Sequence, residues 1–206
     1  MSYGILARRP DLHTDWPWFF RFSGKPPYTR PEEYNFILEE CKKMKFRTIV
    51  LDAASGWMAN WHIFAHNFAH HCVVPILAMD LNPEHLWNFR PHPLITRMLG
   101  DMCGMPFADQ SFDTVFCLSS LEHIPTSYQN RALAELCRVS LDRVILTFDG
   151  LNLERVAEDL KLHGFYAGER IDQEGEPLTN KSGDLVHYVI AERVYESIVA
   201  ETRLDV

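Results

Sequence analysis

Apolar residues follow two alternating patterns along this chain. Short runs rich in β-branched residues, typical of buried parallel strands, occupy 48–52, 73–79, 94–99, 113–119 and 144–148. Between them lie segments whose apolar residues recur every three or four positions, as on the buried face of a helix: 31–45, 57–71, 82–89, 127–139 and 152–163. This alternation predicts an α/β fold with a mostly parallel sheet.

The two ends of the chain break the alternation. Residues 165–171 and 186–194 predict an antiparallel strand pair joined by the polar loop 172–184. Residues 1–30 show little periodicity but are rich in aromatic residues, prolines and glycine, so we expect an aromatic arm with no regular element. This arm either caps a substrate pocket, packs outside the fold or forms a dimer contact, and aromatic anchors favour the cap. Residues 195–206 predict a helical or frayed tail.

Composition and charge narrow the function. A chain of 206 residues with 47% hydrophobic and 23% charged residues is typical of one globular domain. The 28 acidic residues outnumber the 20 basic residues, and this negative charge disfavours binding to nucleic acid. No apolar run has the roughly 20 residues that a membrane-spanning helix needs. The N-terminus lacks a secretory signal, so we expect a cytoplasmic protein. Five widely spaced cysteines indicate buried thiols and no metal or disulfide framework.

Small and acidic residues stand where the predicted strands end. The first strand leads into Ala53-Ala54-Ser55-Gly56, where small side chains let a ligand approach the backbone closely. Asp80 follows the second strand, and in a dinucleotide or adenosine site an acidic residue at this place accepts hydrogen bonds from ribose hydroxyls. Asp101 follows the third strand. Two buried strands, ending near residues 99 and 119, therefore predict a ligand crevice at the carboxyl edge of the sheet.

A histidine stripe runs along the helix predicted at 57–71. His62, His66 and His70 recur at every fourth position, with His71 beside them. Histidines one turn apart can share a metal ion, but no carboxylate or cysteine joins them on that face of the helix. A polar stripe beside a core face is the favoured interpretation, and we expect no metal.

The stretch from Gly100 to Pro125 carries a resemblance to a known family. Its residues Gly100-Asp101, Met105-Pro106-Phe107, Asp109, Ser111-Phe112-Asp113 and Leu121-Glu122-His123-Ile124-Pro125 resemble a run found in class I S-adenosylmethionine-dependent methyltransferases. The resemblance covers about 31–194. It implies a three-layer αβα sandwich whose seven-stranded, mostly parallel Rossmann-like sheet ends in a C-terminal antiparallel hairpin. The family often has a glycine pair before the fifth strand, where this chain has a shorter turn at 140–143.

The resemblance also assigns roles to individual residues. Asp101 and Met102 would meet the adenine, Asp80 the ribose, and Leu118 with Ser119 and Ser120 the methionine part of the cofactor. The cofactor-binding residues are then Asp52, Ala53, Ala54, Ser55, Gly56, Asp80, Leu81, Asp101, Met102 and Leu118. The glycine loop departs from the family pattern, because Ala54 and Met58 stand where the family has glycine.

The resemblance therefore implies methyl transfer from S-adenosylmethionine to an acceptor, which we expect to be a small molecule. His123 is the candidate base if the acceptor carries a proton, although it could instead be a structural turn residue, and Glu122 and Asp149 are weaker candidates. The degenerate glycine loop motivates an alternative, a catalytically inactive methyltransferase-like domain that serves as a binding or scaffold protein. A homodimer is possible, and a classical dehydrogenase has only the acidic residue Asp80 in its favour.

Overall fold

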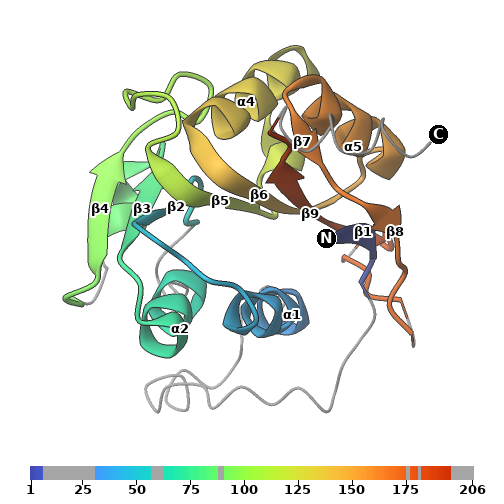
Figure 1. Cartoon of the computed structure of the whole chain (residues 1–206). Coiled ribbons are helices and arrows are strands. Elements are labelled where there is room, and N and C mark those ends of the chain that lie inside the picture. The colour runs from blue at the N-terminus through green and yellow to red at the C-terminus, as the bar shows by residue number, and fades with distance from the viewer. Residues whose placement is uncertain (7–30, 57–62, 88–90, 175–176, 181, 196–206) are drawn as a thin grey trace.

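The computed structural model describes residues 1–6, 31–56, 63–87, 91–174, 177–180 and 182–195. These residues form one sheet of nine strands with helices on both faces (Figure 1). The strands are β1 (Ser2–Ile5), β2 (Val50–Asp52), β3 (Ile76–Asp80), β4 (Ile95–Leu99), β5 (Phe112–Leu118), β6 (Ser140–Asp149), β7 (Phe165–Tyr166), β8 (Glu169–Arg170) and β9 (Val186–Arg193). The helices are α1 (Pro31–Lys42), α2 (Ile63–Cys72), α3 (Pro83–Trp87), the 3-10 turn η2 (Leu121–His123), α4 (Thr126–Val139) and α5 (Leu153–Leu162).

The centre of the sheet is parallel. Its strands lie in the order β4-β3-β2-β5-β6, followed by β9, which runs antiparallel to β6. Strands β3 and β5 are buried along their whole length, as expected for strands covered on both faces. The chain moves outward from β2 to β3 and β4 and then returns to the other side of β2 with β5. This reversal opens a crevice at the carboxyl ends of β2 and β5, the usual ligand site of such sheets.

Two hydrophobic cores hold the three layers together. One lies between the sheet and α4 with α5, and the other between the sheet and α1 with α2, on the opposite face (Figure 1). In α4 the residues Leu133, Leu136 and Val139 point into the first core, as their spacing predicts. The Asn152 side chain accepts a hydrogen bond from the Arg155 backbone N–H and so caps α5, again as expected. The predicted αβα class is thereby confirmed.

The sheet departs from the prediction at its ends. It has nine strands where seven were expected, partly because Ser2–Ile5 form a strand inside the segment predicted to be an irregular arm. Strand β1 pairs antiparallel with β9 and parallel with β8, so the stretch 165–171 is split between two neighbours. Only its first two residues, in β7, pair with β9 as a hairpin would require. The remainder of the predicted arm, including Trp16 to Phe22, lies outside the described residues.

Two further predictions are wrong in detail. The segment 140–143, expected to be a turn, is the beginning of β6, where the Ser140 hydroxyl donates to the Arg143 carbonyl. Strand β4, expected to be buried, is the edge strand of the sheet, and Arg97 and Leu99 are exposed. Arg97 is accommodated there because its guanidinium donates to the Leu86 carbonyl of α3.

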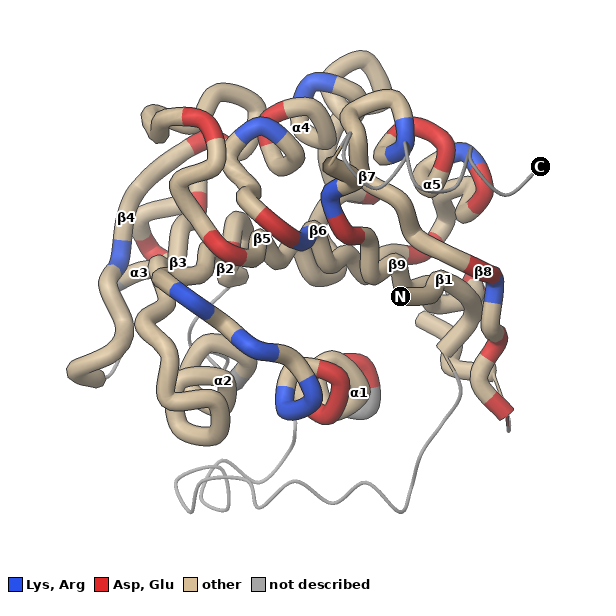
Figure 2. Tube along the Cα trace, in the orientation of Figure 1, with Lys and Arg blue, Asp and Glu red and all other residues tan. Residues whose placement is uncertain are grey.

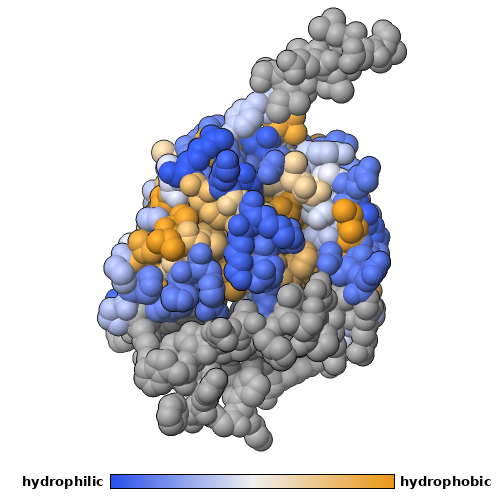
Figure 3. All heavy atoms as spheres, turned by 60° about the horizontal axis from the view of Figure 1, so that its bottom comes forward, coloured by the Kyte–Doolittle hydropathy of each residue, from blue (hydrophilic) through white to orange (hydrophobic). Residues whose placement is uncertain are grey.

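The surface has no dominant basic region in the described chain. Basic residues gather where α1 passes toward β2, and Lys42 and Lys43 are paired there with Glu39 and Glu40 (Figure 2). Seen from the side of α1 and α2, hydrophobic residues lie on either side of a hydrophilic band (Figure 3). Within the described residues, every helix is too short or too polar to cross a membrane.

Candidate functional site

The carboxyl ends of four neighbouring parallel strands surround a cavity of about 820 Å³. Loops after β2, β3, β4 and β5 form one side, and η2 with the first half of α4 forms the other. The lining residues are Ala53, Ala54, Gly56, Asp80, Leu81, His85, Gly100, Asp101, Met102, Cys103, Ser119, Ser120, His123, Ile124, Pro125, Tyr128 and Arg131. The volume is typical of a small-molecule or cofactor site. The structure thus brings together residues that the sequence spreads over about 80 positions.

The loop after β2 is shaped by backbone hydrogen bonds to its neighbours. The Ala53 N–H donates to the Phe116 carbonyl and the Ser55 N–H to the Met79 carbonyl, at 2.8 and 2.9 Å. Gly56 has a φ of +80°, a conformation that favours glycine, and a side chain there would meet nothing within 4 Å. Ala54 is not among the described residues with positive φ, so alanine fits this position of the loop without strain. Met58 lies outside the described residues.

Asp80, at the end of β3, is the most highly connected carboxylate of the cavity. One oxygen accepts from the Gly56 N–H at 2.9 Å, and the other accepts from the Asn82 N–H at 2.9 Å and lies 2.9 Å from Nδ1 of His85. Asp80 therefore joins the loop after β2 to the start of α3. Each carboxylate oxygen has about two acceptor positions, so Asp80 keeps capacity for a ligand hydroxyl while its orientation is fixed.

Seven of the ten predicted cofactor residues line the cavity, and three do not. Asp52, Ser55 and Leu118 do not line the cavity, whereas the other predicted cofactor residues do. The carboxyl of Asp52 is buried beneath the loop, and burial, together with the nearby charge of Asp80, raises its pKa to about 8.

The loop after β4 places Asp101 at the cavity. Gly100 leaves no space for a larger residue, because a Cβ atom there would lie 2.5 Å from the sulfur of buried Met79. One oxygen of the Asp101 side chain accepts from the Cys103 N–H at 2.8 Å, and its carbonyl accepts from the Gly104 N–H. Asp101 therefore closes a tight turn at the wall of the cavity.

A single guanidinium fixes the loop that follows. Arg138 of α4 donates to the carbonyls of Met105 and Phe107, to Asp109 and twice to Glu135, at distances between 2.6 and 3.0 Å. These contacts use all five N–H groups of an arginine.

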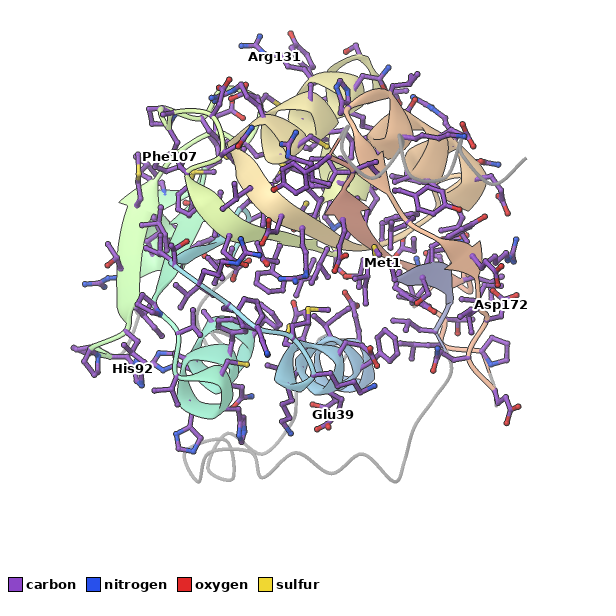
Figure 4. The ribbon with its side chains drawn as sticks, viewed as in Figure 1. Met1, Glu39, His92, Phe107, Arg131 and Asp172 are labelled. Carbon is purple, nitrogen blue, oxygen red and sulfur yellow. The ribbon has the colours of Figure 1, made fainter. Side chains whose placement is uncertain are left out.

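In Figure 4, Phe107 and Arg131 mark the layer of α4, and Glu39 and His92 mark the layer of α1 and α2.

The end of β5 adopts an unusual backbone conformation. Ser119 has a φ of +48°, which is uncommon for a residue with a side chain and is often found at functional sites. Its hydroxyl donates to the buried carboxylate of Glu33 in α1, with oxygens 2.8 and 2.9 Å away. Thr147 of β6 donates to the same carboxylate. The turn at Ser119 thus rests on side chains from two other elements.

The far side of the cavity carries the candidate base. His123, in η2, is exposed and lines the cavity together with Ile124 and Pro125. Glu122 does not line it, and Asp149 lies at the end of β6, also outside the lining. Of the three candidates, only His123 is therefore placed to contact a ligand in this cavity.

Seven lining residues were missed by the sequence prediction, and two of them, Ile124 and Pro125, directly follow His123. His85 follows Asp80 by about one and a half helical turns, and Gly100 and Cys103 flank the predicted Asp101 and Met102. Tyr128 and Arg131 lie three positions apart on one face of α4, but only the packing of that helix reveals that the face borders a cavity.

The histidine stripe does not form a metal centre in the described chain. The ring of His66 packs against His92, and that of His70 against His71, with centroids 5.5 and 5.0 Å apart. No group of three or more His, Cys, Asp and Glu side chains that could hold a metal ion is found among the described residues. His62 lies outside those residues.

Comparison with known proteins agrees with this architecture. Residues 51–146, which include the strands around the cavity, match the model of the methyltransferase domain family. A search of curated proteins found no match.

Solved structures with the same fold are numerous and distant in sequence. A Synechocystis magnesium protoporphyrin IX methyltransferase with bound S-adenosylmethionine shares 15% identity over 85% of this chain and 89% of its own, with a TM-score of 0.61. A phosphoethanolamine N-methyltransferase of Haemonchus contortus shares 21% identity over 64% of this chain, with a TM-score of 0.56. This chain spans only 36% of that enzyme. The [4+2]-cyclase SpnF shares 12% identity over 83% of this chain and 84% of its own, with a TM-score of 0.63. Likeness at these identities shows the fold alone.

Proposed function

The chain has the class I methyltransferase fold, and its residues 51–146 match the methyltransferase domain family; from this premise we propose that it transfers the methyl group of S-adenosylmethionine to a small-molecule acceptor. The observation that carries the proposal is the cavity into which neighbouring strands project Asp80 and Asp101. The chain spans 36% of the Haemonchus contortus enzyme, so that enzyme's substrate is not carried over.

The strand order indicates how an elongated cofactor would lie. Along the edge the cavity passes from Asp101 after β4, through Asp80 after β3 and Gly56 after β2, to Ser119 after β5. At one end of the cavity the Asp101 carboxylate would accept a hydrogen bond from the adenine amine. In the middle the Asp80 carboxylate would accept from the ribose hydroxyls. The methionine part and the sulfonium would then lie near Ser119 and Ser120, on the side where His123 stands.

The degenerate glycine loop is compatible with this cofactor. Ala54 avoids positive φ, and Gly56 occupies the one described position of the loop that adopts it. The Gly56 N–H donates to Asp80, which keeps the backbone close to the cavity wall. These observations favour binding over the alternative of a domain that has lost its cofactor.

The chemistry asked of the protein is modest. S-adenosylmethionine supplies an already activated methyl group, so the chain must orient the acceptor in line with it and exclude water. Tyr128 and Ile124 line the side of the cavity opposite the strand ends and provide an apolar wall there. His123 would accept a proton where the acceptor carries one.

Calorimetric titration of the full chain with S-adenosylmethionine and S-adenosylhomocysteine tests the proposal. Wild-type protein should bind both, and Asp80→Asn and Asp101→Asn should each weaken binding by about 10- to 100-fold, the value of a hydrogen bond to a charged group. Asp159→Asn, on α5 and paired with Arg155, is the matched control and should bind as wild type does.

Three results would contradict parts of the proposal. Absence of binding to both ligands contradicts the proposed function. Unchanged affinity in both cavity variants shows that the ligand binds elsewhere. Tight binding without methyl transfer to any member of a broad set of small amines, phenols and carboxylates favours the alternative of an inactive binding domain.

A further inference from the structure

We infer that Glu33 of α1 is a positioning residue for the end of the cavity that receives the methionine part of the cofactor. Glu33 is fully buried, although it lies in the first turn of its helix and carries a carboxylate. It does not line the cavity, so it acts through the residue that it holds, Ser119. The inference rests on the proposed function, because it assumes that the cofactor occupies the cavity.

The contacts of Glu33 form a closed ring of hydrogen bonds. The Ser119 backbone N–H donates to the carbonyl and to the hydroxyl oxygen of Thr147, at 2.9 and 3.1 Å. The Thr147 hydroxyl donates onward to Glu33, and the Ser119 hydroxyl donates to the same carboxylate from the other side. The carboxylate of Glu33 therefore holds the Ser119 hydroxyl directly and the Ser119 backbone N–H through the hydroxyl of Thr147.

This ring explains why Ser119 keeps its left-handed backbone. A φ of +48° is unfavourable for a residue with a Cβ atom, and it persists only where surrounding contacts over-determine it. Glu33 supplies those contacts from α1, on the face of the sheet opposite α4 (Figure 1). The conformation matters for the site, since Ser119 and Ser120 form the cavity wall at the end of β5.

Two ligands separate positioning from general stability. S-adenosylhomocysteine reaches along the whole strand edge, whereas adenosine lacks the amino-acid part and ends before the turn at Ser119. We expect Glu33→Ala to weaken binding of S-adenosylhomocysteine about tenfold, as it would if the turn at Ser119 kept its binding-competent conformation in about one tenth of the free molecules, and to leave adenosine binding within about twofold. Glu33→Gln retains an acceptor oxygen and should recover part of the loss. Glu39→Ala, on the exposed face of the same helix, is the control and should bind both ligands normally.

Substitutions at Ser119 give a second and independent contrast. Ser119→Gly loses the hydroxyl but adopts φ +48° without strain, so it should lose clearly less S-adenosylhomocysteine affinity than Ser119→Ala does. Ser119→Ala loses the hydroxyl and keeps the Cβ atom, so it should bind about as weakly as Glu33→Ala. A direct hydroxyl–ligand contact would instead weaken both Ser119 variants alike, and that outcome would overturn the inference.

Hydrogen exchange of the ligand-free protein completes the test. Glu33→Ala, or Glu33→Gln if the alanine variant does not fold, should speed exchange of the Ser119 amide more than that of amides in the centre of β5. An equal loss of affinity for adenosine and S-adenosylhomocysteine, or an unchanged exchange rate of the Ser119 amide, rejects the positioning role of Glu33. Either result leaves the proposed function standing. Failure of the wild-type protein to bind S-adenosylhomocysteine rejects the proposed function instead.

Discussion

Replacing Asp52 by asparagine should change how the stability of this protein depends on pH. The Asp52 carboxyl is buried below the cavity, and its pKa is raised from the ordinary 3.8 to about 8, first by burial and then by the charge of Asp80. Between these two values the folded protein holds a proton that the unfolded chain releases. The contribution of Asp52 to stability is therefore complete below about pH 4 and is lost as the pH rises toward 8.

The size of the effect follows from the same two pKa values. Each pH unit within this window changes the free energy of unfolding by about 1.4 kcal/mol for one fully linked proton. From about pH 5 to pH 8 the loss attributable to Asp52 is on the order of 4 kcal/mol, because the slope flattens only near pH 8. The asparagine side chain has nearly the same shape and does not titrate, so Asp52→Asn should gain stability relative to wild type by this amount as the pH rises.

Urea unfolding at about pH 5, 6, 7 and 8 measures the difference. Carboxylates away from Asp52 contribute equally to both proteins, so the difference between Asp52→Asn and wild type isolates the buried group and its coupling to Asp80. Asp159→Asn, whose side chain pairs with Arg155 on α5, serves as the control and should show a constant offset. Parallel curves for wild type and Asp52→Asn over this range would refute the reasoning, since Asp52 would then titrate as an exposed carboxylate does. Asp80→Asn should lower the pKa of Asp52, because it removes the neighbouring charge.

Three further variants test other parts of the structure. Arg138→Ala should lower the free energy of unfolding by about 2 to 3 kcal/mol, since the Met105 and Phe107 carbonyls lose their guanidinium donor and Glu135 loses its ion-pair partner. Urea unfolding measures this change, and a change below the error of the method would contradict it. Gly4→Ala should lower the free energy of unfolding by about 1 to 3 kcal/mol and speed amide exchange in β1, because a Cβ atom there would collide with the Ile171 carbonyl. Exchange rates in β1 equal to those of the wild-type protein would show that β1 is not held against β8. His123→Ala should leave the affinity for S-adenosylhomocysteine within about twofold but lower turnover by about 100-fold for an acceptor that must lose a proton. Equal turnover of the variant and the wild-type protein would exclude His123 as the base.

The centre of this fold could be predicted from local pattern because burial on both faces leaves a strong signal. A run such as Phe112–Leu118 is largely apolar, and Asn152 with Gly164 brackets α5 by cap chemistry. Strand β1 gives no such signal, since its four residues include a glycine and its pairing depends on the distant strands β8 and β9. Local pattern likewise missed the start of β6, where partly exposed residues with polar side chains, such as Arg143, continue the strand.

The candidate site divides in the same way. Acidic residues at strand ends, Asp80 and Asp101, are marked by their position after apolar runs, and the structure brings both to the cavity. Arg131 and Tyr128 reach the cavity through the packing of α4, which sequence spacing does not specify. The role of Glu33 depends on contacts with Ser119 and Thr147, which are far away in the sequence. Long-range contacts of this kind are visible only once the layers are assembled.

The most direct test of the central claim is a crystal structure of the full chain with S-adenosylhomocysteine. The account predicts the ligand along the strand edge, with adenine at Asp101, ribose hydroxyls on Asp80 and the amino-acid part beside Ser119. A ligand bound outside this cavity, or lying in it with adenine beside Ser119, would contradict the assignment.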